Sequence, residues 1–181
     1  MVLKKEKPVK NSVQLLFGSV LDANIEELCG WIISENLAPV KANLLTLLIN
    51  SEGGDLHAAF ALIECMNAST IPVRTVGVGQ TLSAGLIIAM SGTKGMRIVT
   101  PTCSIMSHSY STQIEGNHYS LLEVQRELCY THNRIVEQYI KCTGKSKELI
   151  NEKLTSKNDS WLLPPAAVEF GLFDRVDNLK F

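Results

Sequence analysis

The chain has 181 residues, 45% of them hydrophobic and 19% charged, with a formal net charge of −1. This length suits one well-buried domain and is short for two. Since basic residues cluster only near the N-terminus and the apolar stretches are too short to span a bilayer, we expect neither nucleic acid nor a membrane as a partner.

The N-terminal residues 1–12 are polar and rich in lysine, and we expect a short mobile segment followed by a single domain over 13–181. This segment has no apolar core of a signal peptide. The five cysteines are odd in number and include no CxxC pair, which favours reduced thiols in a cytoplasmic protein. No recognised metal-ligand spacing occurs, so we expect no metal.

Strand-like and helix-like patterns alternate along the chain. In chain order, the pattern predicts a strand at 13–17, a helix at 22–36, a strand at 43–49, a helix at 55–68, a strand at 73–78, a helix at 83–91, strands at 96–99 and 103–107, helices at 119–142 and 146–154, an extended segment at 161–163, a helix from 164 to the glycine at 171, and a strand at 173–176. This alternation predicts an α/β fold with repeated βαβ units and a largely parallel sheet.

The segment 119–142 is the longest predicted helix and carries an apolar stripe. Leu122, Leu128, Ile135 and Tyr139 recur at helical spacing. A compact core of this size offers no evident partner for so long a helix, so we expect it to project outward and to pack on another subunit.

A glycine pair follows the buried strand at 43–49. Gly53 and Gly54 allow positive φ and close approach of a ligand to the backbone, and Asp55 can cap the next helix. The pair is compatible with an ordinary turn. Taken alone, the pair favours such a turn, and it is also compatible with an oxyanion hole, in which a backbone N–H faces developing negative charge.

Ser83 lies between a strand and an apolar helix. The G-x-S-x-G elbow motif is absent because Thr81 stands where that motif has glycine. Ser83 therefore has two interpretations, a helix cap or a nucleophile beside a helix N-terminus. In the second case the N–H of Ala84 would be a further oxyanion donor.

His108 follows another predicted strand and is the histidine set among strand ends, as Ser83 and the glycine pair are. A base of this kind needs a third group to orient it. Asp159, Asp174, Asp177 and Glu169 are the candidates, and spacing alone does not choose among them.

These motifs resemble, in order, those of the proteolytic subunits of Clp proteases (ClpP). They are I-N-S-x-G-G at 49–54, G-x-G-Q-x-x-S-x-G at 77–85, a histidine 25 positions after Ser83, and a C-terminal segment from Asn158 to Asp174. The resemblance covers about residues 13–177, and it implies the ClpP/crotonase-type fold with a protruding handle over about 110–142.

The resemblance also implies a serine endopeptidase. Ser83, His108 and Asp159 would form its triad, and Gly54 and Ala84, with Gly53 adjacent, would form its oxyanion hole. Family members form two stacked heptameric rings around a chamber, into which an AAA+ ATPase feeds unfolded polypeptides. The subunit itself would then need no cofactor, since the partner ATPase uses the ATP.

Several residues differ from the family's usual ones. Glu52, Ala84, Ser109 and Tyr110 stand where the family usually has proline, methionine, glutamine and proline. An alternative therefore stays open: a catalytically weak or structural ring subunit that joins another ClpP in mixed rings. A crotonase-type acyl-CoA enzyme would share the fold but would not need the three triad residues together.

Overall fold

The computed structural model describes residues 10–110 and 117–179. In chain order its elements are β1 (Asn11–Phe17), α1 (Asp22–Leu37), β2 (Leu44–Ser51), α2 (Leu56–Ala68), β3 (Val73–Leu82), α3 (Ala84–Met90), β4 (Arg97–Val99), β5 (Ser104–Ser107), α4 (His118–Thr143), α5 (Lys147–Lys153), β6 (Ser160–Leu162), α6 (Pro164–Phe170) and β7 (Arg175–Val176).

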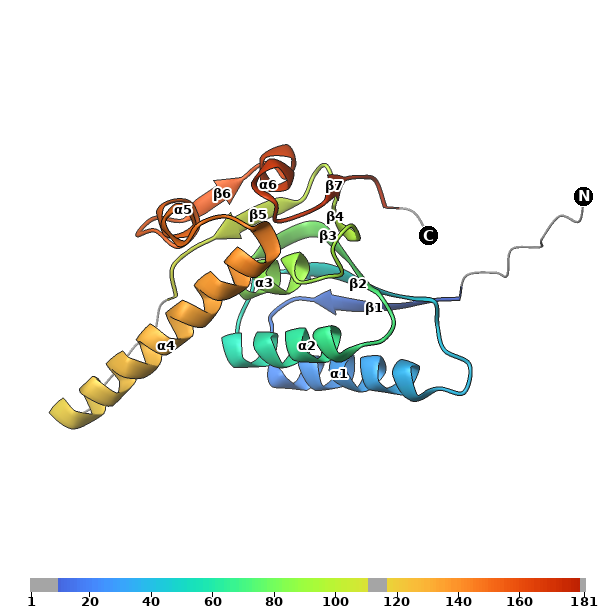
Figure 1. Cartoon of the computed structure of the whole chain (residues 1–181), viewed down its shortest axis with the longest axis horizontal. Helices are drawn as coiled ribbons and strands as arrows, with labels where there is room; N and C mark the ends of the chain where they lie inside the picture. Colours follow the sequence, from blue (N-terminus) through green and yellow to red (C-terminus); the bar gives the residue numbers. More distant parts are fainter. Residues whose placement is uncertain (1–9, 111–116, 180–181) are drawn as a thin grey trace, which may run out of the picture.

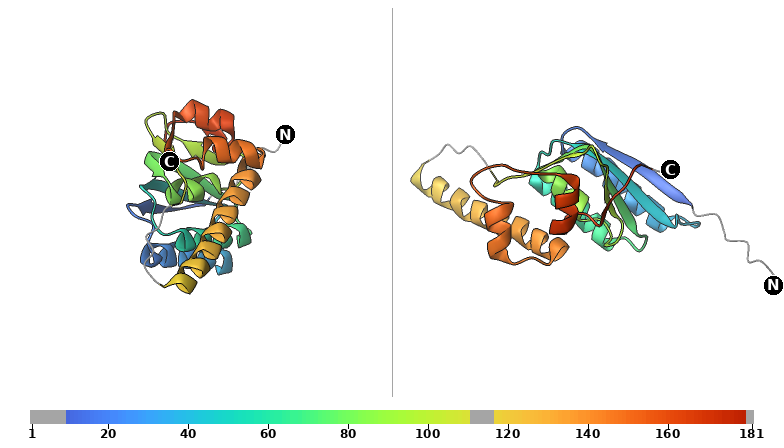
Figure 2. Two further views of the ribbon diagram at one scale, coloured as in Figure 1. Left: turned by 90° about the vertical axis from the view of Figure 1, so that its left-hand side faces the viewer. Right: turned by 90° about the horizontal axis from the view of Figure 1, so that it is seen from above.

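A mostly parallel sheet forms the centre of the fold, as predicted. Its strands follow the order β1-β2-β3-β4-β7, and β5 and β6 branch from β3. All pairs are parallel except β5 with β6. The crossover helices α1 and α2 lie side by side against one face of the sheet (Figures 1 and 2). Parallel strands need such crossovers, and these bury the sheet's apolar face.

Strand β3 continues to Leu82, four residues beyond the predicted end. Its first part pairs with β4 and its last part, Gln80–Leu82, pairs with β5. Between them Gly79 has a φ of 62°, and the N–H of Gln80 donates to Asn50 Oδ1 at 3.2 Å. Gly79, directly after the predicted strand at 73–78, is thus part of a bulge, where the register with β2 shifts. This bulge lets one strand serve two branches of the sheet and carries the chain to Ser83.

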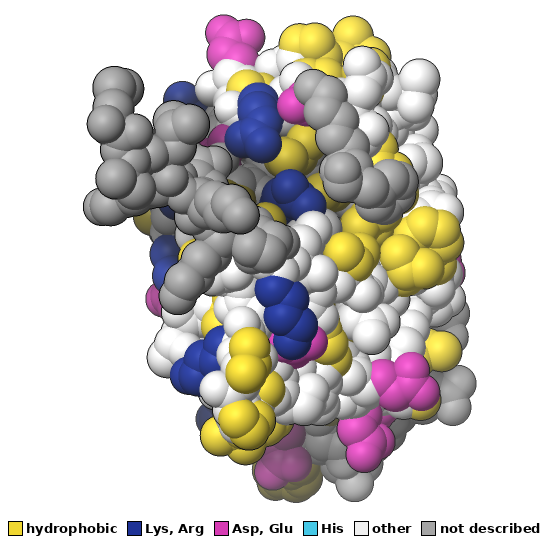
Figure 3. Space-filling model, turned by 90° about the vertical axis from the view of Figure 1, so that its right-hand side faces the viewer, with side chains coloured by type: hydrophobic (Ala, Val, Ile, Leu, Met, Phe, Trp, Pro, Cys, Tyr) yellow, Lys and Arg dark blue, Asp and Glu magenta, His cyan; other side chains and the backbone are white. Residues whose placement is uncertain are grey.

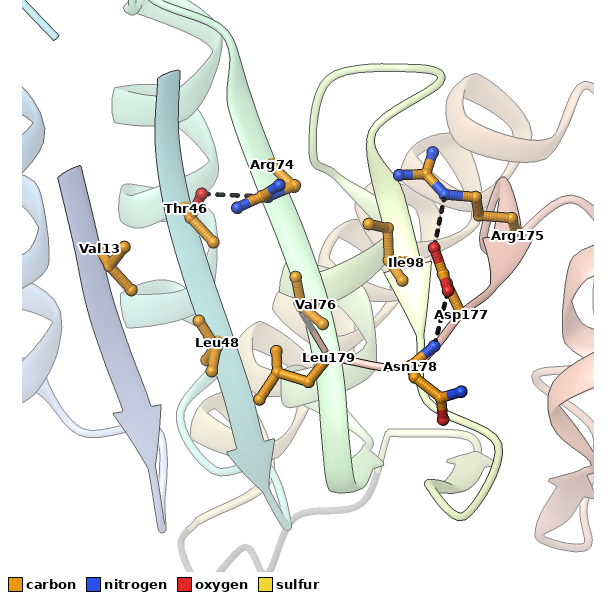
Figure 4. A pocket seen from close by; sticks show the side chains of 10 residues that line it. All are labelled: Val13, Thr46, Leu48, Arg74, Val76, Ile98, Arg175, Asp177, Asn178 and Leu179. Carbon is orange, nitrogen blue, oxygen red and sulfur yellow. Dashed lines mark hydrogen bonds and ion pairs between the residues drawn. The ribbon is translucent and has the colours of Figure 1, made fainter. Parts of the chain in front are cut away.

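The opposite face of the sheet is partly open. A small second cluster of Leu48, Val76 and Ile98 lies on it, beside a hollow of about 120 Å³. Figure 4 shows this hollow in front of the strands, with Leu179 from the C-terminal segment beside it. Strand β2 is therefore largely buried, as its apolar run predicts, but helices cover it on one side only.

Helix α4 extends well beyond the body of the molecule (Figures 1 and 2). Near its C-terminal end, Ile135, Val136 and Tyr139 are buried against the core. Toward its N-terminal end, Tyr119 and Leu121 are exposed. The projecting helix matches the prediction; residues 111–116 of the predicted handle region lie outside the described residues.

The N-terminal boundary differs from the prediction. Strand β1 begins at Asn11, and Asn11 and Ser12 pair in parallel with β2. The Ser12 hydroxyl also donates to Glu35 at 2.7 Å and accepts from Trp31 at 2.9 Å. These contacts overcome the polar character that suggested a mobile segment over 1–12; residues 1–9 lie outside the described part.

A buried ion pair joins the C-terminal segment to the sheet. Arg97, with a side chain 4% exposed, bonds Asp174 Oδ1 at 2.6 Å and donates to the carbonyl of Cys142 at 3.0 Å. Burial raises the pKa of Asp174, but hydrogen bonds from Arg97 and from the Gly95 N–H outweigh burial and hold that pKa below its ordinary value. The pair therefore stays charged at neutral pH and ties α4 to β4.

Surface charges are mixed. On the face shown in Figure 3, Lys and Arg side chains lie over the left and centre, Asp and Glu side chains lie among them and toward the lower right, and apolar side chains form separate patches. Among residues 10–110 and 117–179, no helix has both the length and the apolar character that crossing a membrane requires.

Candidate active site

Ser83 occupies a strained turn between β3 and α3. Its φ of 52° and ψ of −124° make it the described non-glycine residue with positive φ. Such a conformation costs on the order of 1–3 kcal/mol and persists only where the surroundings hold it. Ser83 is the N-cap residue of α3, but its side chain makes no cap hydrogen bond, so its hydroxyl does not serve as a cap. The geometry is that of a nucleophile elbow, although its sequence motif is absent.

Gly53 packs directly against this turn. A Cβ at Gly53, whose φ is 103°, would lie 2.7 Å from Ser83 Cβ and 2.9 Å from the Leu82 carbonyl oxygen. The N–H of Ser83 in turn donates to the Met106 carbonyl at 2.9 Å. Gly53 is thus required because its backbone closely approaches that of Leu82 and Ser83. The contact with Gly53 and the hydrogen bond to Met106 together stabilise the strained conformation of Ser83.

His108 lies immediately after β5 and contacts Ser83. Its Nε2 is 2.7 Å from Ser83 Oγ. Because β5 pairs in parallel with the last residues of β3, both strands end at the same edge of the sheet, which brings these side chains together. A neutral imidazole at this distance can accept the serine proton, which is the arrangement of a general base and its nucleophile.

Two backbone N–H groups near Ser83 are available. Within the described residues, the N–H groups of Gly54 and Ala84 make no hydrogen bond. Gly54 is held by a parallel bridge to Val20, in which Val20 donates to Gly53 and accepts from Asp55. Ala84 is the first residue of α3. Both predicted donors therefore flank the serine and have the capacity to bind an oxyanion.

The four candidate acids lie in different environments. Asp174 is committed to Arg97, and Asp177 lies 3.8 Å from Arg175 on the far side of the sheet. Glu169 is exposed on α6. Asp159 directly precedes Ser160, which pairs with Ser107, so Asp159 stands one step past the ladder, opposite His108. Tertiary structure thus makes a choice that spacing did not.

The structure does not complete a hydrogen-bonded triad. Asp159 is exposed, and within the described residues no hydrogen bond joins it to His108. The Nδ1 atom of His108 accordingly has no partner there. The structure therefore brings together Ser83, His108 and the glycine pair, and leaves Asp159 adjacent.

A cavity of about 140 Å³ opens beside the serine. Its lining comprises Gly54, Leu56, Ser83, Ile87, His108, Tyr110, Ile135 and Tyr139. Apolar and aromatic side chains form most of this wall, which suits an apolar side chain of a bound polypeptide. The sequence pattern missed this role for Ile135 and Tyr139, because both belong to the apolar stripe of α4 and read as core.

The five cysteines are all free thiols, as predicted. Burial raises the pKa of Cys103 and of Cys142, which makes these thiols poor nucleophiles. In the part of the chain that the structure describes, no group of three or more metal-binding side chains comes together.

Comparisons with known proteins agree with the fold and with the motifs. The family model described as Clp protease matches residues 23–179. A Chlamydia abortus protein named ATP-dependent Clp protease proteolytic subunit 1 is 34% identical over 134 residues, 73% of this chain and 69% of its own length. A subunit 2 from Nocardia farcinica is 30% identical over 163 residues, 90% of this chain and 79% of its own length. The chain therefore belongs to the Clp protease family, as the ordered motifs predicted.

Proposed function

We propose that this chain is a serine endopeptidase subunit of the Clp type, which hydrolyses unfolded polypeptides to short peptides. The observation that carries the proposal is the 2.7 Å contact between His108 Nε2 and Ser83 Oγ at a strained turn. Family membership adds support, since the similar proteins are named proteolytic subunits.

The proposed reaction is acyl transfer through Ser83. His108 Nε2 takes the hydroxyl proton as Ser83 Oγ attacks the peptide carbonyl, and the N–H groups of Gly54 and Ala84 receive the oxyanion. His108 then gives the proton to the leaving amine. Water, activated by the same imidazole, hydrolyses the acyl-enzyme and releases Ser83. This chemistry needs no metal or cofactor in the subunit.

Asp159 is proposed as the third member of the triad. Its register position opposite His108 supports this role, and it would bind His108 Nδ1, which has no partner among the residues that the structure describes. A carboxylate there holds the imidazole in the correct tautomer and stabilises its protonated form.

A fluorophosphonate probe tests the proposal, because such probes react with activated serines. Wild-type protein should label at Ser83 and cleave a short fluorogenic peptide. Ser83→Ala should abolish labelling and lower the chemical rate by about 10⁵–10⁶. Ser104→Ala, an exposed serine on the neighbouring strand, is the matched control and should label normally. Equal hydrolysis by wild type and Ser83→Ala would refute the assignment.

A second candidate function is a structural or catalytically weak ring subunit that partners another ClpP. The absence of a hydrogen bond between Asp159 and His108 in the described residues favours it. The similar proteins include subunits named 1 and 2, which is compatible with mixed rings. Labelling of Ser83 only when a second ClpP is added would support mixed rings, and labelling of the purified chain alone would argue for an autonomous enzyme.

Assembly into two stacked heptameric rings, with an AAA+ ATPase feeding them, is part of the proposal. The apolar stripe of α4 supports it. Ile135 and Tyr139 are buried at the base of the helix. Leu121, which was not among the predicted stripe residues, lies two heptads before Ile135 and so on nearly the same face, and it extends the stripe as exposed surface where the helix leaves the body. Exposed apolar surface of this kind is typical of an interface.

Leu121→Glu tests this contact by placing a charge on the projecting stripe. We expect the variant to form smaller assemblies than wild type in native mass spectrometry while its thermal midpoint as a monomer stays unchanged, because Leu121 is already exposed. Arg126→Glu, on the opposite face of the same helix, is the control and should assemble normally. A fully active wild-type monomer would refute the chamber mechanism but not the triad.

A further inference from the structure

A buried chain of hydroxyl groups lies behind the candidate active site. Ser107 Oγ is 2.7 Å from Tyr139 OH and 2.6 Å from the carbonyl oxygen of Leu154. Ser107 and Tyr139 are each 1% exposed. A carbonyl only accepts, so Ser107 donates to Leu154 and Tyr139 must donate to Ser107.

The tyrosine is well suited to remain a donor. Burial raises the pKa of Tyr139 to about 12, and although the hydrogen bond to Ser107 acts in the opposite direction, the phenol stays protonated at neutral pH. The hydroxyl groups of Tyr139 and Ser107 and the carbonyl of Leu154 each make a hydrogen bond. They are buried, and a buried polar group without its hydrogen bond costs about 1–3 kcal/mol. Such a chain has a single low-energy arrangement.

The hydroxyl chain lies directly beside His108 in the sequence, through Ser107. Ser107 is the last residue of β5, and His108 follows it directly. The ladder of β5 with β3 ends at Met106 and the ladder with β6 ends at Ser107, so His108 lies beyond both. Ser107, whose side chain is held by two hydrogen bonds, is therefore the last residue that the sheet fixes before His108.

The same chain of hydroxyl groups ends at the segment that leads to Asp159. Leu154 is fully buried at the end of α5, and the loop from Leu154 leads to Asp159 at the start of β6. Tyr139 belongs to the base of α4 and also lines the cavity beside Ser83. One hydroxyl chain thus joins α4, the strand before His108, and the start of the Asp159 loop.

We propose that Tyr139 and Ser107 are positioning residues that hold His108 in line with Ser83 and set its distance from the Asp159 loop. This inference rests on the proposed peptidase function. Neither residue contacts the reacting atoms; both act by fixing the backbone on each side of the base. A displacement of the order of 1 Å at such a site costs about 100-fold in rate.

Tyr139→Phe removes one hydroxyl and keeps the ring that fills the core. We expect kcat on a fluorogenic peptide to fall about tenfold with KM within about twofold, because the base is misplaced while the substrate cavity keeps its shape. The rate of fluorophosphonate labelling of Ser83 should fall by a similar factor. The thermal midpoint should fall by several degrees, because one buried hydrogen bond is lost, while the native mass should match wild type.

Tyr130→Phe is the matched control, the same chemical change on the same helix. Tyr130 is 64% exposed and far from the hydroxyl chain, so its variant should match wild type in every measurement. Ser107→Ala is a second variant that removes both hydrogen bonds, and its kcat should fall further, by about 30- to 100-fold.

The outcomes separate this inference from the proposed function. If wild type cleaves and labels but Tyr139→Phe has wild-type kcat, the positioning role is wrong and the peptidase function stands. A loss of kcat that appears only together with loss of assembly would make Tyr139 merely structural and would also overturn the role. If wild type neither labels nor cleaves, alone or with a second ClpP, both proposals fail together.

Discussion

The turn around Ser83 and the loop around Asp159 are the two halves of the candidate site, and the fold holds them very differently. Ser83 keeps a strained backbone because Gly53 packs against it and Met106 bonds its N–H. Asp159 is exposed, one residue outside a short antiparallel ladder, with no bond to His108 in the described residues. The fold of one chain therefore brings Ser83 and His108 into contact, whereas it leaves Asp159, the proposed orienting acid, near His108 without a hydrogen bond to it in the described residues.

Asp174 provides a useful contrast with Asp159, because the sequence offered both as partners for His108. Asp174 accepts from the Arg97 guanidinium and from the N–H groups of Gly95 and Arg97. A carboxylate satisfied in this way serves stability and has no capacity left for catalysis. Asp159 makes no hydrogen bond within residues 10–110 and 117–179, so its carboxylate keeps the capacity to bond the base.

The largest effect expected from this comparison is that of Asp159→Asn. Loss of the carboxylate should favour the wrong tautomer of His108 and lower kcat by on the order of 10⁴. The thermal midpoint should not change, because Asp159 is exposed and makes no hydrogen bond in the described residues. Peptidase kinetics would check the fall in kcat, and a thermal melt would check the unchanged midpoint. An active Asp159→Asn enzyme would mean that Ser83 and His108 work as a dyad.

Gly53→Ala should disturb the turn around Ser83, which is the half of the site that the fold holds in place. The new Cβ overlaps Ser83 and must displace the turn, so we expect kcat/KM to fall by about 10²–10³. Gly18→Ala is the matched control: Gly18 also has positive φ, 86°, but a Cβ there has no neighbour within 4 Å. We expect both variants to lose stability through backbone strain. Only Gly53→Ala should lose more activity than its loss of stability explains. Equal activity loss in the two would show that Gly53 does not support the serine.

Asp174→Asn should have the smallest effect on activity and a clear one on stability. It leaves the Arg97 guanidinium buried beside a group that cannot balance its charge, which costs about 3 kcal/mol. Activity at temperatures where the variant is folded should stay within about tenfold of wild type. The reverse pattern, lost activity at full stability, would exchange the roles of Asp174 and Asp159.

The pH dependence of this stability follows from the lowered pKa of Asp174. A carboxyl whose pKa is lower in the folded than in the unfolded state stabilises the fold above its unfolded pKa and loses that contribution as pH falls through the folded value. The difference in thermal midpoint between wild type and Asp174→Asn should therefore be full near neutrality and shrink as pH falls below the ordinary aspartate value of 3.8. A constant difference across this range would contradict the assigned cause.

The sequence by itself determined the α/β class, the order of strands and helices and the projecting helix, because hydrophobic period and turn residues are local signals. The family followed from the resemblance of the ordered motifs at 49–54, 77–85 and 158–174. It also predicted the set that meets at the site: the glycine pair, Ser83, Ala84 and His108. The predicted end of β3 at residue 78 was wrong, because the strand continues through a bulge at Gly79 that depends on Asn50 from another strand.

Spacing left the acid open and the motif resemblance named Asp159, but only tertiary structure shows that Asp159 stands opposite His108 and what Tyr139 does. Asp159 and Asp174 are equivalent in local pattern, and their difference arises from Arg97 on a distant strand and from the β5–β6 register. Tyr139 fits an apolar stripe, and its hydroxyl gains a role only because Ser107 and Leu154 converge on it from two other elements. Contacts between residues far apart in sequence carry no local period, and so no pattern in the chain could have shown them.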